Sequence, residues 1–252
     1  MKRLVFLFCL IALGSCKERD ESLTAQMIVD KAIGVSCQGN CEDATIKFVF
    51  RAKNYTVQRN AGRYRYERIS RDSSGITTDV LTNDGFARYK NDSLIAISDS
   101  MSTKYSNSIN SVVYFVQLPF GLNAPATKKK LLGELSIKGE AYYKILVSFD
   151  QDGGGVDYED VFVYWVHKKS FTVDYLAYAY KVDGGGMRFR EAYNPRELEG
   201  IRFVDYNNYK PLKADVSVTA TDALFESGAL KLLSKIETEQ IEVQYTDANE
   251  PL

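Results

Sequence analysis

The sequence predicts a mainly β protein: a single large curved antiparallel sheet or half-open β-barrel with one or two covering helices. After residue 44, apolar and polar residues alternate with a period of two through most of the chain. Glycine, aspartate and asparagine separate these runs at short intervals, which implies antiparallel pairing because parallel strands need long crossovers. Aromatic residues make up 12% of the chain, with 17 Tyr, 13 Phe and one Trp, and this mixture suits strands with one wet and one dry face.

Two helices are predicted from a period near 3.6. The first covers residues 22–34, SLTAQMIVDKAIG, where Ser22 can cap the amino end and Gly34 can end the helix. Its apolar stripe consists of Met27, Ile28, Ala32 and Ile33. The second covers residues 106–117, SNSINSVVYFVQ, in which Ile109, Val112, Val113 and Val116 share one face.

The remaining pattern predicts about ten strands. The early ones are ATIKFVFRA, RYRYERISR and the meander GITTDVLTNDGFARYKNDSLIAIS, whose turns are Asn83-Asp84-Gly85 and Asn91-Asp92. After the second helix come LLGELSIKG, AYYKILVSFD, DVFVYWVHK, SFTVDYLAYAYK, GMRFREAYN and LEGIRFVDYNNY. The tail adds a short capped helix, TDALFESG, and a final alternating strand, EQIEVQY.

The amino-terminal segment has the parts of an export signal. Lys2 and Arg3 form a positive region, and residues 4–13 form an apolar run too short to span a bilayer. Leu13-Gly14-Ser15-Cys16 then supplies small residues before a cysteine. This stretch resembles the lipobox of bacterial lipoproteins, in which the cysteine is acylated and the chain is cut before it. The alternative is an ordinary secretory signal whose cysteine is accidental.

The lipobox resemblance implies a division of the chain into three parts. Residues 1–15 are the signal peptide, residues 16–22 a tether lipidated at Cys16, and residues 23–252 a single β-barrel-like domain. Lys17 resembles the residue found in lipoproteins released to the outer membrane, and KERDE is similar to charged tags that lead some lipoproteins to the cell surface. We therefore expect a lipid-anchored outer-membrane protein, on the periplasmic side or at the cell surface. A plain solvated tether is the alternative for KERDE.

The charge balance argues against nucleic acid as a partner. The chain has 32 Lys and Arg against 33 Asp and Glu, for a net charge of −1. Cleavage before Cys16 would remove Lys2 and Arg3 and no acid, which makes the mature chain more acidic. No basic field is left to attract a polyanion. The expected partners are the membrane, through the N-terminal lipid anchor, and a hydrophobic ligand or an envelope protein.

Cys37 and Cys41, in VSCQGNCED, are predicted to form a disulfide. The bacterial envelope is oxidising, and Gly39-Asn40 provides a turn between the two thiols. The spacing suits neither a CxxC redox motif nor a zinc knuckle.

Two other features of the sequence are of residue types that can carry chemistry. The loop SFDQDGGGVDYED carries five acids, which is the density of a calcium loop, but the spacing is not that of an EF-hand, and we expect a hairpin loop between two strands. His167 is the single histidine and stands beside a predicted turn, without a nucleophile-elbow sequence elsewhere. The sequence therefore assigns no catalytic residue, cofactor or metal site.

Candidate ligand-lining residues come from the aromatic strands. On DVFVYWVHK both faces are apolar, with Val161, Val163 and Trp165 opposite Phe162, Tyr164 and Val166. On the next strand, small alanines interleave with tyrosines and leave room inside a curved sheet. The candidates are Tyr164, Trp165, Tyr175, Tyr178, Tyr180, Phe189 and Arg190, with Arg188 as a second cation for a head group or carboxylate. Plain core packing is the alternative.

Three segments carry a resemblance to a family of bacterial lipoproteins of unknown function: NSINSVVYFVQLPFGLN, DYEDVFVYWVHKKSFTVDYLAYAY and GGGMRFREAYNPRELEGIRFVDYNNY. The resemblance covers most of residues 22–245 and implies no activity. The layout is also similar to that of the lipoprotein-sorting carriers, LolA/LolB-like half-barrels in which a helical lid holds acyl chains; this likeness is one of topology.

These observations lead to three functional hypotheses. The first is a lipid-anchored envelope protein that binds a hydrophobic or amphipathic ligand, such as acyl chains, in a half-barrel. The second is a non-catalytic envelope protein whose packed barrel docks a partner. The third is a hydrolase, which would need His167 or a carboxylate pair in a cleft.

Overall fold

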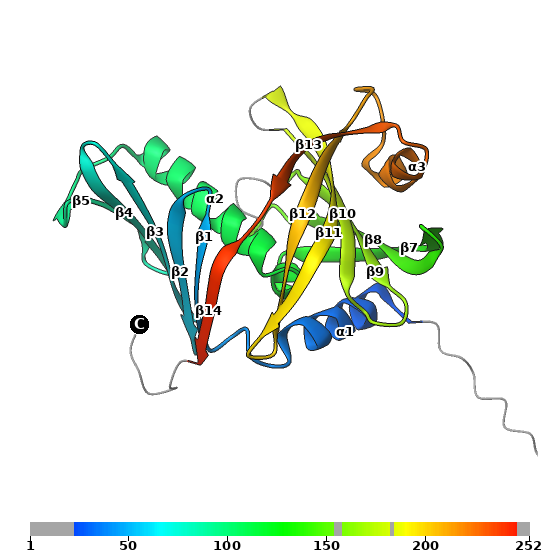
Figure 1. Ribbon diagram of the computed structural model, residues 1–252, viewed down its shortest axis with the longest axis horizontal. Coiled ribbons are helices and arrows are strands. Elements are labelled where there is room, and N and C mark those ends of the chain that lie inside the picture. Colours follow the sequence, from blue (N-terminus) through cyan, green and yellow to red (C-terminus); the bar gives the residue numbers. More distant parts are fainter. Residues whose placement is uncertain (1–22, 154–157, 182–183, 246–252) are drawn as a thin grey trace, which may run out of the picture.

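The computed structural model describes residues 23–153, 158–181 and 184–245, and within these ranges it contains two antiparallel sheets of seven strands each (Figure 1). In spatial order, the first sheet is β14 (Glu239–Tyr245), β1 (Ala44–Phe50), β2 (Lys53–Asn60), β3 (Arg63–Asp72), β4 (Gly75–Thr82), β5 (Gly85–Lys90) and β6 (Ser93–Leu94). The second is β13 (Leu230–Ile236), β12 (Ile201–Pro211), β11 (Gly186–Leu198), β10 (Val173–Tyr180), β9 (Val161–His167), β8 (Glu140–Phe149) and β7 (Thr127–Ile137). The mainly β, half-open architecture is confirmed, although the strands are more numerous than expected and fall into two sheets.

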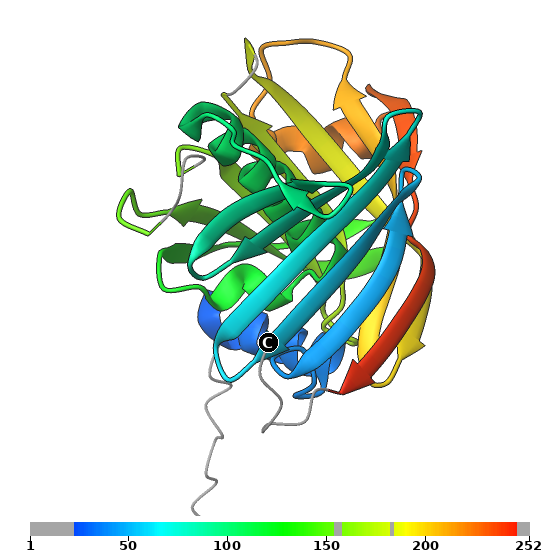
Figure 2. The same ribbon diagram turned by 90° about the vertical axis from the view of Figure 1, so that its left-hand side faces the viewer.

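Three helices complete the described fold. Helix α1 (Ala25–Cys37) lies along the lower end of the second sheet, and α2 (Asp99–Val116) runs diagonally between the two sheets (Figure 1). Helix α3 (Thr221–Glu226) follows a 3-10 turn (Val218–Ala220), and a second 3-10 turn (Phe120–Asn123) follows α2. In Figure 2 the first sheet stands in front of the second, so the two sheets form opposite walls.

The buried apolar side chains form three clusters. One lies between α1 and the inner face of the second sheet, with Ile28 and Val29 of α1 packed near Tyr164 and Leu176. Another lies between α2 and the first sheet, and includes Ile109. The third covers the outer face of the second sheet and includes Trp165, Tyr175, Phe189 and Val218. Both faces of β9 are therefore buried, as its two apolar faces predict.

The C-terminal strands connect the sheets. Strand β13 pairs with β12 in the second sheet, and β14 pairs with β1 in the first, so the chain changes sheets at Glu237 and Thr238. The carboxylate of Asp205, which is 3% exposed, lies at this point. It accepts hydrogen bonds from Arg196 Nη1 at 2.6 Å and Nη2 at 2.8 Å, from Asn194 Nδ2 at 2.7 Å, and from the Thr238 backbone N–H at 3.0 Å.

The helix ends differ from the predicted ones. Thr24 caps α1, its hydroxyl accepting from the Met27 N–H at 3.2 Å, whereas the predicted cap Ser22 lies outside the described residues. Gly34 does not end α1; the helix continues to Cys37 and closes at Gln38 in a left-handed conformation, whose N–H bonds the Gly34 carbonyl. Ser98 caps α2, which begins seven residues before its predicted start because the polar turn 99–105 carries little apolar signal.

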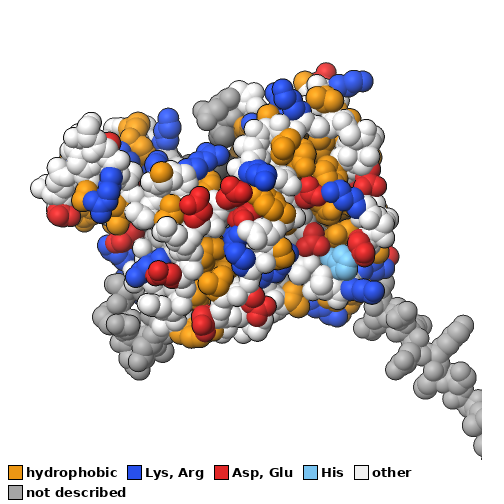
Figure 3. Space-filling model, viewed as in Figure 1, with side chains coloured by type: hydrophobic (Ala, Val, Ile, Leu, Met, Phe, Trp, Pro, Cys, Tyr) orange, Lys and Arg blue, Asp and Glu red, His pale blue; other side chains and the backbone are white. Residues whose placement is uncertain are grey.

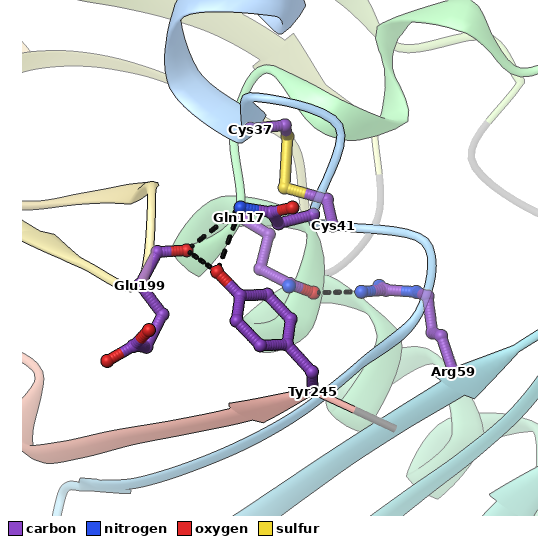
Figure 4. The surroundings of a disulfide bond; sticks show 7 residues. Cys37, Cys41, Arg59, Gln117, Glu199 and Tyr245 are labelled. Atoms are coloured by element: carbon purple, nitrogen blue, oxygen red, sulfur yellow. Dashed lines mark hydrogen bonds between the residues drawn. A yellow bond between two sulfur atoms is a disulfide. The ribbon is translucent and has the colours of Figure 1, made fainter. Parts of the chain in front are cut away.

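The disulfide between Cys37 and Cys41 stands where α1 hands over to β1 (Figure 4). Within the loop it closes, Asn40 Nδ2 donates to the Glu199 carbonyl at 3.1 Å and to the Tyr245 hydroxyl at 3.0 Å. The Tyr245 hydroxyl donates in turn to the same carbonyl at 2.7 Å. The neighbouring Gly200 has φ +69°, a conformation in which other residues are strained, and a Cβ on it would lie 2.7 Å from Asn40 Nδ2 and displace that side chain. The loop thus ties α1 to the β11–β12 turn and to β14.

None of the helices within the described ranges combines the length and the apolar character that crossing a bilayer requires.

The environment of Asp205 leads to a pH-dependent stability prediction. Burial raises the pKa of this carboxyl, but the hydrogen bonds from Arg196, the Thr238 N–H and Asn194 outweigh burial and hold its pKa below the usual value. Such a group stabilises the fold above the unfolded pKa of about 4 and loses that contribution as the pH falls through the folded pKa. We expect Asp205→Asn to lower the free energy of unfolding by about 3 kcal/mol at pH 7, and the deficit to shrink below about pH 4.

Urea denaturation at pH 7 and at pH 3 measures both effects. Asp174→Asn is the matched control, since Asp174 forms a more exposed ion pair with Arg202 at 3.3 Å, and its removal should change stability by less than about 1 kcal/mol. A deficit of Asp205→Asn that is equal at both pH values would contradict the electrostatic account.

Candidate functional site

A cavity of about 680 Å³ lies between α2 and the second sheet. Its walls come from α2, the β1–β2 turn, the strands β8 to β13, and Thr238 at the change of sheet. The apolar and aromatic lining consists of Phe50, Val112, Tyr114, Phe115, Val116, Phe149, Phe162, Tyr178, Tyr180, Val204, Tyr206, Leu233 and Ile236. The polar lining consists of Arg51, Asn107, Asn110, Ser111, Asp160, Arg188, Arg190, Asn208, Ser234 and Thr238.

Four aromatic rings form a continuous apolar wall in this cavity. Phe162 of β9 stacks on Tyr178 of β10 with ring centroids 5.3 Å apart, and Phe149 meets Phe162 edge-on at 5.8 Å. Phe115 of α2 closes the wall from the opposite side, with its ring centroid 5.4 Å from that of Tyr178. Such a wall offers contact area to an apolar chain without requiring a specific orientation.

Arg190 of β11 is a buried cation in the same cavity. It is 7% exposed, and its Nη2 donates to the Tyr178 hydroxyl at 2.9 Å. Its guanidinium lies 3.8 Å from the ring centroid of Phe115 and 5.8 Å from that of Tyr206. These rings stabilise the cation partly through their π faces, but its Nε has no hydrogen-bond partner in the described part of the chain.

Asn208 of β12 lies directly across from Arg190 in the β11–β12 register. Its Nδ2 donates to the Ser234 hydroxyl of β13 at 3.2 Å, while its Oδ1 is buried without a partner among the described residues. Arg190, Asn208 and Ser234 therefore form a polar row across three adjacent strands, surrounded by aromatic rings. An amphipathic molecule matches a cavity that combines one polar row with an apolar wall.

Helix α2 is attached differently to the two sheets. Toward the first sheet, Arg68 donates to the Ser108 hydroxyl at 2.8 Å, the Arg88 guanidinium lies 3.4 Å from the Tyr105 ring centroid, and the Gln117 side chain accepts from Arg59 at 2.5 Å. Buried Asp79 holds both Arg68 and Arg88, at 2.6 Å and 2.5 Å. Charged groups thus hold α2 on the side of the first sheet.

Toward the second sheet, the hydroxyls of Tyr114 in α2 and Tyr164 in β9 form a hydrogen bond of 2.5 Å. Burial raises the pKa of both phenols well above the ordinary value, so both stay protonated at neutral pH. Burial likewise raises the pKa of nearby Tyr206 to about 12. This side of α2 therefore carries neutral hydroxyls and aromatic rings around the cavity.

The residues proposed from the sequence as ligand-lining divide between the two faces of the second sheet. Tyr178, Tyr180 and Arg190 line the cavity, and so does Arg188. Tyr164 points to the same side but is fully buried beneath the cavity, bonded to Tyr114. Cys16 lies outside the described residues.

Trp165, Tyr175 and Phe189 do not line the cavity, contrary to the expectation from the sequence. They alternate with the lining residues on their strands and so point to the outer face of the sheet. There the ring of Phe225 in α3 stacks on Phe189 at 4.8 Å, and Trp165 Nε1 donates to Asp222 at 3.2 Å. These three side chains build the core under α3.

Phe115, Tyr206 and Asn208 line the cavity but were not among the sequence candidates. Val204, Tyr206 and Asn208 occupy every second position of β12 and share one face. This strand was predicted, so its alternation already grouped the three residues. Phe115 lies at the end of the predicted second helix, next to its apolar stripe. The sequence pattern did not show which face of the sheet borders the cavity.

Of the two features that the sequence offers for chemistry, His167 does not line the cavity, whereas the acidic loop ends at Asp160 in the cavity lining. His167 stands at the end of β9, where its Nδ1 accepts from the Ser170 N–H at 3.1 Å and its Nε2 lies 3.3 Å from Glu140. The acidic loop connects β8, which ends at Phe149, with β9, which begins at Val161, and its residues 154–157 lie outside the described ones. Within the described ranges, no group of three or more His, Cys, Asp or Glu is arranged to hold a metal ion.

The model of the Family of unknown function (DUF6503) matches residues 1–238. The chain belongs to this family. This agrees with the resemblance seen in the sequence, and the family description carries no activity. No protein with a curated description matches the chain by sequence.

Several solved structures resemble this fold. A LolA superfamily protein from Nitrosomonas europaea superposes with a TM-score of 0.50 at 14% identity, covering 90% of this chain and 95% of that chain. A DUF1329 family protein from Desulfovibrio piger gives a TM-score of 0.42 at 16% identity, with coverages of 83% and 100%. Lipoprotein LppX from Mycobacterium tuberculosis gives 0.27 at 12% identity, with coverages of 63% and 87%. The first of these supports the LolA-like layout, and at such identities the likeness concerns the fold alone.

The hydroxyl pair of Tyr114 and Tyr164 gives a testable prediction about how α2 is held. Tyr114→Phe leaves the buried Tyr164 hydroxyl unpaired, so we expect the free energy of unfolding to fall by about 1–3 kcal/mol. The double variant Tyr114→Phe/Tyr164→Phe removes both polar groups and should be close to the wild type, within about 1 kcal/mol. Urea denaturation of the two single variants and the double variant measures this cycle; a double variant that loses the sum of both single losses would contradict it.

Proposed function

We propose that this protein is a lipid-anchored envelope protein that binds a hydrophobic or amphipathic ligand in the cavity beneath α2. The observation that carries the proposal is the cavity of about 680 Å³, since small-molecule sites occupy about 300–1,000 Å³. A barrel that serves only to dock a partner is filled by its own side chains, as interiors normally are.

The lining supports an amphipathic rather than a purely apolar ligand. The wall of Phe115, Phe149, Phe162 and Tyr178 suits an apolar chain. Arg190 and Asn208 suit a polar end, because each carries a buried polar atom with no partner in the described residues. A ligand that supplied those partners would be held in one orientation.

Helix α2 provides the cover. Its side toward the first sheet is fixed by the arginines around Asp79, and its polar residues Asn107, Asn110 and Ser111 line the cavity at the helix surface. A cover of this kind excludes water from the aromatic wall while leaving a polar rim. The half-open layout of two sheets with a covering helix provides the enclosed space that the role needs, and its fold is similar to that of a LolA superfamily protein.

The anchor and the location are proposed from the amino-terminal sequence. The charged start, the short apolar run and the box ending in Cys16 together point to an acylated cysteine. Two or three acyl chains hold a protein to a bilayer essentially permanently, whereas one is marginal. Lys17 favours the outer membrane, with the domain on the periplasmic side or at the cell surface.

The outer surface of the described part of the molecule shows no strongly charged face in the view of Figure 3. Basic, acidic and apolar side chains are interspersed over the face shown in Figure 3. This fits the net charge of −1 and gives no field for a polyanion such as nucleic acid.

Ligand binding can be tested on residues 17–252 exported without the lipidated cysteine. This chain retains every described strand and helix and all three apolar clusters, so it keeps the whole core of the fold. Purified from cells and examined by native mass spectrometry, it should carry a bound mass that organic solvent removes. Clean protein that also fails to bind the neutral fluorophore N-phenyl-1-naphthylamine would contradict the proposal and favour a docking protein.

A pair of variants on α2 localises that binding. Ser111 lines the cavity and is exposed on the helix, so Ser111→Trp places a large ring at the opening and should weaken fluorophore binding about tenfold. Ser100→Trp, in the first turn of the same helix and outside the cavity lining, is the matched control and should bind as the wild type does.

The anchor is tested separately in cells. Cys16→Ser should abolish labelling by radioactive palmitate and should release the protein from the membrane fraction, since no acyl chain then attaches. Cys9→Ser, within the apolar run, is the control and should leave labelling intact. Membrane association and palmitate labelling that persist in Cys16→Ser would contradict the anchor without touching the cavity.

A further inference from the structure

The polar row in the cavity has a property that the rest of the lining lacks. Arg190 and Asn208 are 7% and 9% exposed, and the register places them opposite each other on adjacent strands. Arg190 Nε, a donor, and Asn208 Oδ1, an acceptor, are both buried without a partner in the described residues. Buried polar atoms are nearly always paired, so an unpaired donor and an unpaired acceptor on facing residues indicate a site for a bound polar group.

The positive charge of Arg190 indicates the charge of the bound group. Arg68, the other arginine that is buried in the described residues, has a carboxylate: it pairs with Asp79 at 2.6 Å. Arg190 has only the Tyr178 hydroxyl and the faces of aromatic rings among the interactions the structure describes. A buried cation in apolar surroundings is most strongly stabilised by an anion.

The side chain of Asn208 can supply a second donor to the same anion. Turning its amide by half a rotation directs Nδ2 to the cavity and Oδ1 to Ser234, whose hydroxyl can then donate instead of accept. With an acid bound, Arg190 Nε and Asn208 Nδ2 both donate to it. The Ser234 hydroxyl donates to Asn208 Oδ1, and no polar atom of the row stays unpaired.

We propose that the cavity takes an anionic single-chain amphiphile whose acid, a carboxylate or a phosphate, binds Arg190 and Asn208. This deepens the proposed function and rests on it. The apolar chain of this ligand lies against Phe115, Phe149 and Phe162. The cavity volume of about 680 Å³ has room for one such chain, and it falls within the range of small-molecule sites, about 300–1,000 Å³.

The other charged groups of the lining agree with this orientation. Arg188 lies on the same strand as Arg190 and Arg51 lies on the β1–β2 turn, so the cavity lining contains two further cations. Asp160, the acid among the described lining residues, precedes β9 and lies on the far side of β10 from Arg190. The acid of the ligand therefore meets Arg190 rather than a like charge.

The experiment compares three probes with the same sixteen-carbon chain on the chain of residues 17–252. Hexadecanoate and hexadecyl phosphate carry the two acids, and hexadecanol carries none. Each probe displaces N-phenyl-1-naphthylamine, and the midpoint of the displacement curve gives its affinity. We expect at least one of the acids to bind about tenfold or more tightly than hexadecanol, because charge-assisted hydrogen bonds contribute that much. The acid that binds more tightly identifies carboxylate or phosphate as the natural head group.

Two variants and one control assign this preference to the row. Arg190→Gln removes the cation with little change of size, and Asn208→Asp places a carboxylate beside Arg190 that takes the position of the ligand acid. Both should lower the preference for the acids about tenfold and leave the affinity for hexadecanol unchanged. Arg71→Gln, at an exposed arginine of β3, matches the charge change and should keep the preference. Asn208→Asp supplies Arg190 with an internal partner, so it also serves if Arg190→Gln fails to fold.

The outcomes separate this inference from the proposed function. Equal affinity for all three probes, or a preference that survives both variants, overturns the inference while binding in the cavity stands. Failure of every probe and of the fluorophore to bind overturns the proposed function and the inference with it.

Discussion

Asp205 stands where the chain leaves one sheet for the other, and its carboxylate accepts hydrogen bonds from Arg196, Asn194 and the Thr238 N–H. Thr238 is buried between the end of β13 and the start of β14, where no strand of the described chain pairs with it. Without Asp205 its N–H would have no hydrogen-bond acceptor. With that donor satisfied, the two sheets can diverge instead of closing on each other. Ile236 and Thr238, on either side of the change, form part of the cavity wall. The change of sheet, where Asp205 satisfies one buried backbone group, thus borders the open space beneath α2.

The divergence of the sheets leaves α2 with two different neighbours. On one side it meets Arg68, Arg88 and Arg59, whose charges are organised around Asp79 and Gln117. On the other it meets a cavity, a ring wall and a single hydroxyl pair with Tyr164. The proposed ligand would therefore reach the cavity between α2 and the second sheet without breaking the charged contacts that hold the helix to the first sheet. The polar row of Arg190, Asn208 and Ser234 lies on the sheet and stays fixed whatever the helix does.

Most elements could be predicted from period and turns, and the exceptions have physical causes. Strand β2 was missed because only two of its buried residues, Tyr55 and Val57, are apolar; the third is Asn60. Strand β13 was missed because it has a bulge beside the adjacent leucines 232 and 233, where the register with β12 shifts between Asn208 and Tyr209 and the alternation breaks.

The candidate site could be predicted only in part. Both faces of β9 are apolar, so the pattern on that strand contains no information about which face meets a helix and which a cavity. Trp165 was assigned to the wrong side for that reason. Tyr175 and Phe189, on the next two strands, were assigned to the wrong side because the pattern does not show that α3 covers the outer face of the sheet. Tyr178, Tyr180 and Arg190 line the cavity, as expected from the small alanines that alternate with tyrosines and leave room inside a curved sheet; that they contact a ligand stays a prediction.

The start of α1 at Ala25, capped by Thr24, bears on how close the domain stays to a bilayer. If Cys16 carries the acyl chains, the eight residues 17–24 separate the lipid from the folded body. Fully extended, they reach at most about 26–29 Å. The barrel then stays within roughly one bilayer thickness of the headgroups, and any amphiphile it receives has only a short distance to travel from the leaflet.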